Sequence, residues 1–243
     1  MRSVFRMLRA LAKLRKRKTW GPFVEAAEIS GFDHSFTISW SQSGEDLALL
    51  SLLGTQKKGT YLDVGAHHPT RFSVTRHLYQ RGWNGVNVDA NKDLVQEFIK
   101  VRSRDINLCC AVGEESSYEF TVFEESAIST TNSTWRDKFL AESNAIHRVE
   151  QVQGRSLRDI YDEHFHRLPV DVLTVDAEGA DAEILRSMYF ETLQAERFPR
   201  YLMLESSPPI NIALDTPAVA MAISLGYKPQ LVLPMVTILK RSI

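Results

Sequence analysis

Short apolar runs recur along most of the chain, and each is followed by a polar or glycine-containing turn. Apolar runs of this kind, bounded by turns, are typical of buried strands. They predict strands at about 60–65, 85–89, 106–112, 118–123, 171–176, 201–205, 229–233 and 235–240. The last two runs are close enough in sequence to form an antiparallel pair.

Segments with apolar residues at helical spacing lie between these runs. In the segment 92–101, for example, Leu94, Phe98 and Ile99 share one face of a helix. Helical spacing and glycines at helix ends predict further helices at 41–54, 72–81, 157–165 and 216–225, and one after the turn at 178–179. Because strands that alternate with helices form mainly parallel sheets with right-handed crossovers, the pattern predicts an α/β fold.

The segment 124–148 breaks this pattern. It is rich in serine, threonine and asparagine, and the sequence predicts a loop with a short helix at about 135–142. Long loops inside compact domains are usually functional or disordered. We therefore expect 124–148 to be an insertion that caps the substrate.

Composition indicates an ordinary globular protein. The chain has 243 residues, 44% of them apolar and 24% charged, with a formal net charge of -1. The net charge therefore gives no electrostatic attraction to nucleic acid, and no apolar run approaches the roughly 20 residues that cross a bilayer.

The adjacent residues Cys109 and Cys110 are the only cysteines. A disulfide between neighbours would be strained, so we expect two buried thiols in a reducing compartment.

Charge is concentrated at the amino-terminal end. Eight lysines and arginines lie in residues 2–18, and subtracting them from a net charge of -1 leaves about -9 for the rest. Apolar residues between these charges make the segment a candidate peripheral anchor on an anionic membrane leaflet. The alternatives are a solvated arm or a helix packed on a partner subunit. We expect a basic segment at 1–20, a single domain at 21–243, and a cytoplasmic location or the inner face of the membrane.

Candidate chemistry begins at the first strand, which ends in the turn Asp63-Val64-Gly65-Ala66. The next strand ends in Asp89, where a nucleotide-binding fold places an acid on the ribose. The chain lacks both GxGxxG and GxxxxGK[ST], so few backbone N–H groups are available to bind phosphate. A nucleoside cofactor without phosphate, such as S-adenosylmethionine, therefore fits best. Acids also end later strands, at Asp176 and Glu205.

Five separate motifs resemble the FkbM-type S-adenosylmethionine-dependent methyltransferases, in the same order over about 41–205. They are 42–46 (QSGED), 61–75 (from YLDVGAHHP to RFSVT), 81–89 (RGWNGVNVD), 102–108 (RSRDINL) and 175–179 (VDAEG). The resemblance implies a Rossmann-like class I methyltransferase fold, with a mainly parallel seven-stranded sheet and a carboxy-terminal antiparallel pair.

The resemblance also implies roles for individual residues. Asp63, Gly65 and Ala66 would form the loop at the methionine part of the cofactor, and Asp89 would accept the ribose hydroxyls. Asp89 stands where this family often has Glu. Asp176 would lie under the transferring methyl group. Four segments would complete the cofactor site: Gln42 with Glu45 and Asp46, His67, Ala90, and Ala111 with Val112.

The implied reaction is O-methylation, which needs a group that removes a hydroxyl proton. The candidates are Asp176, Glu178 and His68, with His67 as a further base, although a histidine in such a turn can equally cap or pack. Asp176 and Glu178 with a third acid could also bind Mg²⁺, although acids scattered in the sequence leave no diagnostic spacing.

Two chemical classes of acceptor are compatible with the sequence. We favour a sugar hydroxyl of a surface glycan or its lipid-linked precursor, and a polyketide or other secondary metabolite is the alternative. A cofactor-binding module without catalysis is a further possibility. Nucleic acid is not expected as a partner, since the basic residues lie in one terminal segment away from the candidate site. The oligomeric state cannot be read from the sequence.

Overall fold

The computed structural model describes residues 37–166, 169–206 and 210–242. Residues 39–243 form one compact unit. The predicted basic segment at 1–20, and with it the membrane anchor and the domain boundary after residue 20, lies outside the described residues. None of the described helices is long and apolar enough to span a membrane.

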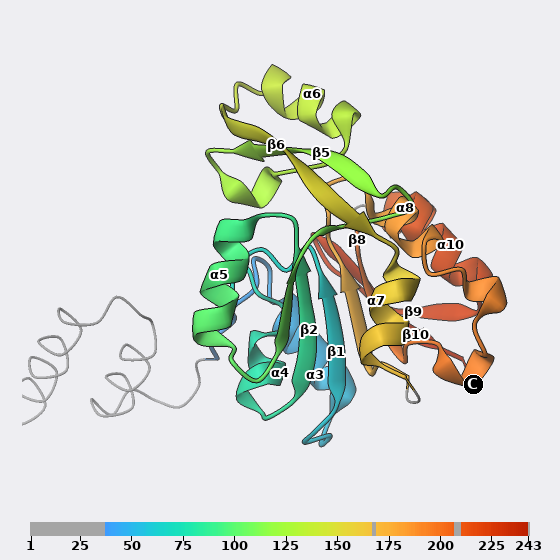
Figure 1. Ribbon diagram of the computed structural model, residues 1–243. Coiled ribbons are helices and arrows are strands. Elements are labelled where there is room, and N and C mark those ends of the chain that lie inside the picture. The colour runs from blue at the N-terminus through green and yellow to red at the C-terminus, as the bar shows by residue number, and fades with distance from the viewer. Residues whose placement is uncertain (1–36, 167–168, 207–209, 243) are drawn as a thin grey trace, which may run out of the picture. The chain divides into compact units, whose positions relative to one another are not determined.

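A seven-stranded sheet forms the centre of the domain (Figure 1), with the order β3-β2-β1-β7-β8-β10-β9. All neighbouring pairs up to β8 are parallel, and β10 is antiparallel to both β8 and β9. The predicted fold class is therefore confirmed. The strands are β1 (Thr60–Val64), β2 (Asn84–Asp89), β3 (Ile106–Cys109), β7 (Val172–Val175), β8 (Tyr201–Glu205), β9 (Tyr227–Val232) and β10 (Val236–Arg241).

The order of the strands creates a switch point between β1 and β7. From β1 the chain builds outward through β2 and β3, and it then returns to the other side of β1 with β7. Ligands of open parallel sheets bind beyond the carboxyl ends of the strands at such a point. The fold thus brings the segments after Val64, Asp89 and Val175 to one edge.

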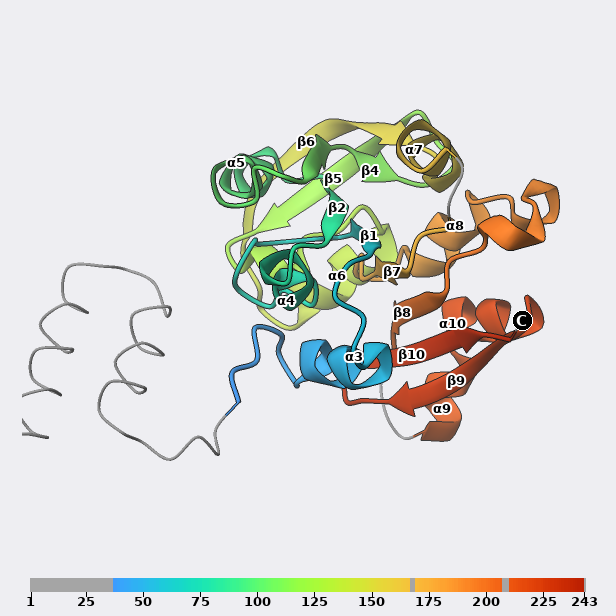
Figure 2. The same ribbon diagram turned by 90° about the horizontal axis from the view of Figure 1, so that it is seen from below.

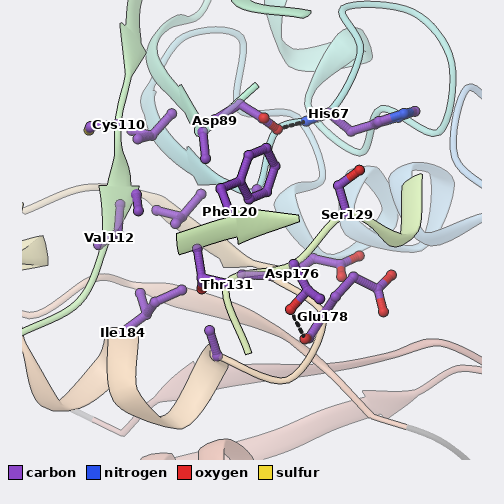
Figure 3. Close-up of a pocket in the computed structure, with 18 of the residues that line it drawn as sticks. His67, Asp89, Cys110, Val112, Phe120, Ser129, Thr131, Asp176, Glu178 and Ile184 are labelled. Carbon is purple, nitrogen blue, oxygen red and sulfur yellow. Dashed lines mark hydrogen bonds between the residues drawn. The ribbon is translucent and has the colours of Figure 1, made fainter. Parts of the chain in front are cut away.

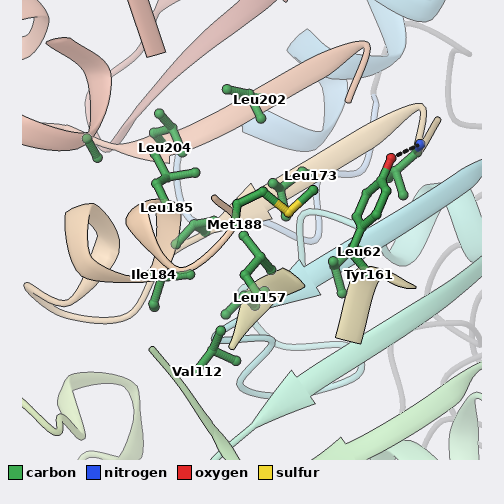
Figure 4. Close-up of a cluster of buried hydrophobic side chains, with 14 of the residues drawn as sticks. Leu62, Val112, Leu157, Tyr161, Leu173, Ile184, Leu185, Met188, Leu202 and Leu204 are labelled. Carbon is green, nitrogen blue, oxygen red and sulfur yellow. Dashed lines mark hydrogen bonds between the residues drawn. The ribbon is translucent and has the colours of Figure 1, made fainter. Parts of the chain in front are cut away.

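Helices cover both faces of the sheet (Figures 1 and 2). On one face, Leu62, Leu173 and Leu202 pack against α7 (Leu157–His164), α8 (Asp181–Arg186) and α10 (Pro217–Ser224) in the larger hydrophobic core (Figure 4). On the other face, Tyr61 and Met203 pack against α3 (Glu45–Leu53) and α4 (Arg76–Gln80). This arrangement follows from strand geometry, because successive side chains point to opposite faces.

A second, three-stranded sheet has the order β4-β6-β5 and lies beyond one end of the main strands (Figure 1). The predicted strand at 118–123 is confirmed as β5, whereas the predicted strand at 106–112 is interrupted at Cys110, with β4 in the second sheet. The chain between β5 and β6 forms a 3-10 helix and an α-helix. The elements are β4 (Ala111–Val112), β5 (Ser117–Phe123), η1 (Ser126–Ile128), α6 (Ser133–Ala141) and β6 (Ile146–Arg155).

The main fold error of the sequence analysis is β6, which it does not predict. Neither face of this strand is fully buried along 146–155, and five of its residues from His147 to Gln153 are polar or charged. Such a strand has no apolar run to detect.

The prediction of two buried thiols is wrong for Cys109, which is exposed because it lies on the edge strand β3. Cys110 is buried as expected.

Most helix predictions agree within a few residues, and α5 (Lys92–Val101) agrees at both ends. The helix expected at 72–81 is shorter, because Phe72 has a φ of 56° and residues before Arg76 form a loop. The sequence analysis does not predict three short elements, namely η2 (Phe190–Thr192), η3 (Ala195–Arg197) and α9 (Ile210–Asp215).

Candidate active site

Two adjoining pockets open at the carboxyl ends of β1, β2 and β7. The first pocket holds about 590 Å³ of empty space (Figure 3). It brings together predicted residues that are far apart in the sequence, and Phe120, Ser126 and Ile184 complete its wall. The predicted residues are Gly65, His67, Asp89, Ala90, Ala111, Val112, Asp176 and Glu178.

Gly65 allows the loops after β1 and β7 to meet. It has a φ of +74°, and a Cβ atom at this position would lie 1.7 Å from the carbonyl oxygen of Asp176. The N–H groups of Gly65 and Ala66 both donate to the carbonyl of Val88, which fixes the loop against β2. A side chain at residue 65 would therefore separate the two loops that form the pocket floor.

Asp89 ends β2 with both carboxylate oxygens held by backbone N–H groups. One oxygen accepts from Asn91 at 2.7 Å and the other from His67 at 2.8 Å. Burial raises the pKa of Asp89 to about 6, and these two hydrogen bonds oppose part of the rise. Since each carboxylate oxygen has two acceptor positions, the fixed side chain keeps capacity for the hydroxyl groups of a ligand.

His67 links the two sides of the first pocket. Its backbone has a φ of 53°, and its Nε2 lies 3.0 Å from the hydroxyl of Ser126 on η1. Burial, with a smaller contribution from Arg71, lowers the pKa of His67 to about 4. The ring is therefore neutral near pH 7. Its Nδ1 is buried and has no hydrogen-bond partner in the described part of the chain.

The second pocket adjoins the first and shares Gly65, His67, Ala127, Asp176 and Glu178 with it. It holds about 940 Å³ of empty space, and α6 supplies one of its walls. Its further lining residues include Gln42, Phe72, Trp135, Lys138, Phe139 and Glu205.

Carboxylates gather in and beside the second pocket. The group, which we call the strand-end acids, comprises Asp176, Glu178, Asp181 and Glu205. Burial raises the pKa of each, and repulsion from Glu205 adds to the rise for the other three: to about 8 for Glu178, to about 7 for Asp181 and well above the usual value for Asp176. Lys138 opposes the rise for Glu178 and Glu205.

Hydrogen bonds hold the insertion beside these acids. The hydroxyl of Thr130 donates to the carbonyl of Glu178 at 2.9 Å, and the Asn132 amide donates to the carbonyl of Gly179 at 3.0 Å. Asn132 also caps the first turn of α6. These contacts place Trp135, Lys138 and Phe139 in the second pocket. The sequence does not predict these three residues as part of the site, and their helical spacing is its one indication that they share a face.

Four predicted site residues line neither pocket. Asp63 is buried and accepts a hydrogen bond from Thr75 at 2.6 Å, and burial raises its pKa to about 6. Ala66 is buried in the β1 loop, and Glu45 is buried and accepts from the Ser43 N–H. His68 accepts from two backbone N–H groups of its own turn, those of Thr70 and Arg71, through Nδ1. For His68 the geometry therefore matches the capping alternative.

Asp46, which was expected beside Glu45, also has a structural contact. Its carboxylate accepts from the backbone N–H of Trp40 and from the hydroxyls of Ser39 and Ser41, before α3. For metals, no group of three or more histidine, cysteine or acidic side chains within the described ranges could hold an ion.

A family model described as the methyltransferase FkbM domain matches residues 63–211, well over half of the chain. No curated protein matches the chain in sequence.

Solved structures of similar fold include a TehB-like SAM-dependent methyltransferase from Corynebacterium glutamicum. It is 9% identical with a TM-score of 0.42, over 92% of this chain and 96% of that one. Fibrillarin from Aeropyrum pernix, solved with S-adenosyl-L-methionine, is 12% identical with a TM-score of 0.43, over 80% and 71% of the two chains. TrmK from M. capricolum, solved with S-adenosyl-homocysteine, is 11% identical with a TM-score of 0.41, over 83% and 69%.

Proposed function

The chain belongs to the FkbM family of S-adenosylmethionine-dependent methyltransferases, and from this premise we propose that it methylates a hydroxyl group of a sugar. The observation that carries the proposal is the position of Glu178. This side chain lines both pockets, and its pKa of about 8 suits a group that accepts a proton near neutral pH.

The first pocket fits the cofactor. Asp89 would accept the ribose hydroxyls, because its carboxylate is held in place by two backbone N–H groups. Ala111 and Val112 offer an apolar wall for the adenine, and the Gly65 turn offers close approach for the methionine part. Bound S-adenosylmethionine would supply a methyl group on a sulfonium centre. The strand-end acids, including Asp176, would then face a cation, which favours their ionised form.

The second pocket would hold the acceptor. Glu178 would take the proton that the acceptor hydroxyl loses as its oxygen is methylated, and α6 would exclude water from that side. His67 is neutral near pH 7 and shares the pocket wall, so it could hold the hydroxyl in position. His68 does not line this pocket.

The lining of the second pocket supports a neutral polyol as the acceptor. It combines the aromatic rings of Phe72, Trp135 and Phe139 with polar side chains, whereas a polyketide would fit better in an apolar pocket. Three acids and one lysine in this lining disfavour an acceptor that carries a carboxylate or phosphate. A surface glycan or its lipid-linked precursor at the inner face of the membrane stays our preferred source of such an acceptor.

The test is incubation of the full chain with S-adenosylmethionine and a panel of neutral glycosides, with methylated products detected by mass spectrometry. We expect an O-methylated sugar from the wild type and little from Glu178→Gln. Calorimetry with S-adenosylhomocysteine should show that the variant still binds the cofactor product. Cofactor binding without methylation of any panel member, while polyketide alcohols are methylated, would overturn the sugar assignment.

Metal dependence is tested in the same assay. If a divalent ion takes part, EDTA should abolish methylation and Mg²⁺ should restore it. Unchanged turnover in EDTA would contradict a role for a metal. Turnover of S-adenosylmethionine with any acceptor would contradict the alternative of a non-catalytic binding module.

A further inference from the structure

A third pocket adjoins the second one on the far side of the strand-end acids. It holds about 640 Å³ of empty space and shares Trp135 and Glu205 with the second pocket. We infer that this third pocket is a second sugar subsite, so that the acceptor is a glycan of at least two units: the methylated unit lies in the second pocket and the adjacent unit in the third. This inference rests on the proposed function.

Trp135 is the common wall of the two pockets, and its ring is fixed in place. A Cβ atom on Gly179 would lie 2.0 Å from Cδ1 of the indole, so the ring lies directly against the Gly179 backbone. The ammonium of Lys138 lies 4.1 Å from the centroid of Trp135, and the Phe139 ring lies 5.4 Å away. A fixed indole can contact the C–H groups of two successive sugar units, one on either side of their linkage.

Asp181 supplies the polar group that points to a ligand. Its side chain is 6% exposed and belongs to the pocket wall, yet its Oδ1 has no hydrogen-bond partner in the described part of the chain. A buried polar atom without a partner is costly, and a ligand hydroxyl would remove that cost. Burial and the nearby Glu205 raise the pKa of Asp181 to about 7. The carboxyl can therefore donate to or accept from a hydroxyl near neutral pH, which suits a polyol.

The remaining wall favours a neutral sugar. Small residues, Ala182 of α8 and Ala218 of α10, leave room beside Ser206 and Thr216. No lysine, arginine or histidine is among the described residues of this wall. With Asp181 and Glu205 as its charged groups, the pocket would repel a uronic acid or a sugar phosphate.

The test uses a substitution that narrows the third pocket and leaves the first and second pockets unchanged. Ala182 lines the third pocket alone, and Ala182→Leu would fill part of it. The matched control is Ala220→Leu, at an exposed position of α10 outside all three pockets. The probes are methyl monoglycosides and disaccharides that contain the same methylated sugar. Calorimetry with S-adenosylhomocysteine first confirms that both variants are folded and bind the cofactor product.

We expect the wild type to prefer a disaccharide over the matching monoglycoside by about tenfold in kcat/KM. Ala182→Leu should remove most of that preference by raising the KM of the disaccharide, and its turnover of the monoglycoside should be unchanged. Ala220→Leu should keep the preference. Equal use of both acceptor lengths by the wild type would overturn the second subsite and leave the proposed function standing. Methylation of no glycoside by a protein that binds S-adenosylhomocysteine would instead overturn the proposed acceptor class.

Discussion

Two groups of acids lie inside this domain, and their hydrogen bonding differs. The first surrounds Arg102, whose side chain is fully buried. The second is the group of strand-end acids, for which Lys138 is the one nearby cation among the residues that the structure describes. The acids of the first group all have hydrogen-bond partners and hold a loop in place, whereas Asp176 and Glu178 of the second group have no side-chain partner among the described residues. The comparison indicates that pairing, more than residue type or burial, separates structural acids from functional ones.

Every acid around Arg102 has partners. The guanidinium donates to the carbonyl of Pro69 and to the side chains of Ser73, Thr75 and Asn87. Thr75 in turn donates to Asp63. On the same face, Asp105 accepts from the Tyr61 hydroxyl, the Gly85 N–H and the Asn87 amide. These bonds fix the loop after β1, which carries His67 into the pocket wall.

The strand-end acids show the opposite pattern. Among the residues that the structure describes, no side chain forms a hydrogen bond or ion pair with the carboxylates of Asp176 or Glu178. Glu178 also has a φ of 47°, a backbone conformation that is unfavourable for a residue with a side chain. Strain and unpaired charge at one place are typical of a site that is completed by its ligand.

The largest expected effect is on stability, through Arg102. Replacement by Met in Arg102→Met would leave Asp63 without its buried cation and several acceptors without their donor. We expect a loss of about 3–5 kcal/mol in the free energy of unfolding, measured in urea. The control is Arg104→Met, at an exposed position, which should cost less than about 1 kcal/mol. Equal losses would contradict a structural role for the Arg102 network.

Glu178→Gln should instead leave the fold intact and remove the base. We expect kcat to fall by roughly 10²–10⁴-fold, while the affinity for S-adenosylhomocysteine changes little. The matched control is Glu142→Gln, at the exposed end of α6. A variant as active as the control would assign proton removal to another group.

Asp89→Ala should weaken cofactor binding without affecting the strand-end acids. Loss of the ribose acceptor is expected to cost about 1–3 kcal/mol in the affinity for S-adenosylhomocysteine, measured by calorimetry. Asp93→Ala, on the exposed side of α5, serves as the control. Unchanged affinity in Asp89→Ala would remove this residue from the cofactor site.

The smallest expected effect is the change with pH in the stability of the ligand-free protein. The folded-state pKa values of Glu178 and Asp181, about 8 and about 7, lie above the ordinary values of 4.5 and 3.8 for these side chains. The folded protein therefore binds more protons than the unfolded chain between these limits, and stability falls as pH rises through this range. His67 acts in the opposite direction, but only between about 4 and 6.5.

The melting temperature of the free protein should therefore rise when the pH is lowered from 8 to 7, a range in which His67 does not titrate. Glu178→Gln removes one of the groups that titrate in this range, so its melting temperature should rise less. If the melting temperatures of the wild type and of Glu178→Gln changed in parallel with pH, the result would contradict the raised pKa of Glu178.

The sequence predicts the cofactor side of the site better than the acceptor side. Gly65, Asp89 and Asp176 follow buried parallel strands, and parallel strands bring their carboxyl ends to one edge whatever the details of packing. The face on which Asp63 lies depends on strand alternation, which places it with Tyr61 toward α4 and away from the pocket.

The acceptor side depends on contacts that have no local pattern. Trp135 and Lys138 reach the acids because Asn132 and Thr130 bind the carbonyls of Gly179 and Glu178, which are more than 40 residues away in sequence. The half-exposed strand β6 closes the insertion without an apolar run. The role of His68 could not be predicted for the same reason, since a catalytic and a capping histidine cannot be distinguished in the sequence before the conformation of the turn is known.

A cationic ligand that completes the site would explain why Asp176 and Glu178 have no side-chain partner among the described residues. Calorimetric titration with S-adenosylmethionine at pH 7, in two buffers of different ionisation enthalpy, tests this explanation most directly. A cation beside Glu178 and Asp181 lowers their pKa values, so we predict micromolar binding with net release of protons, and less release from Glu178→Gln. Binding without proton release, or no binding by folded protein, would contradict the account.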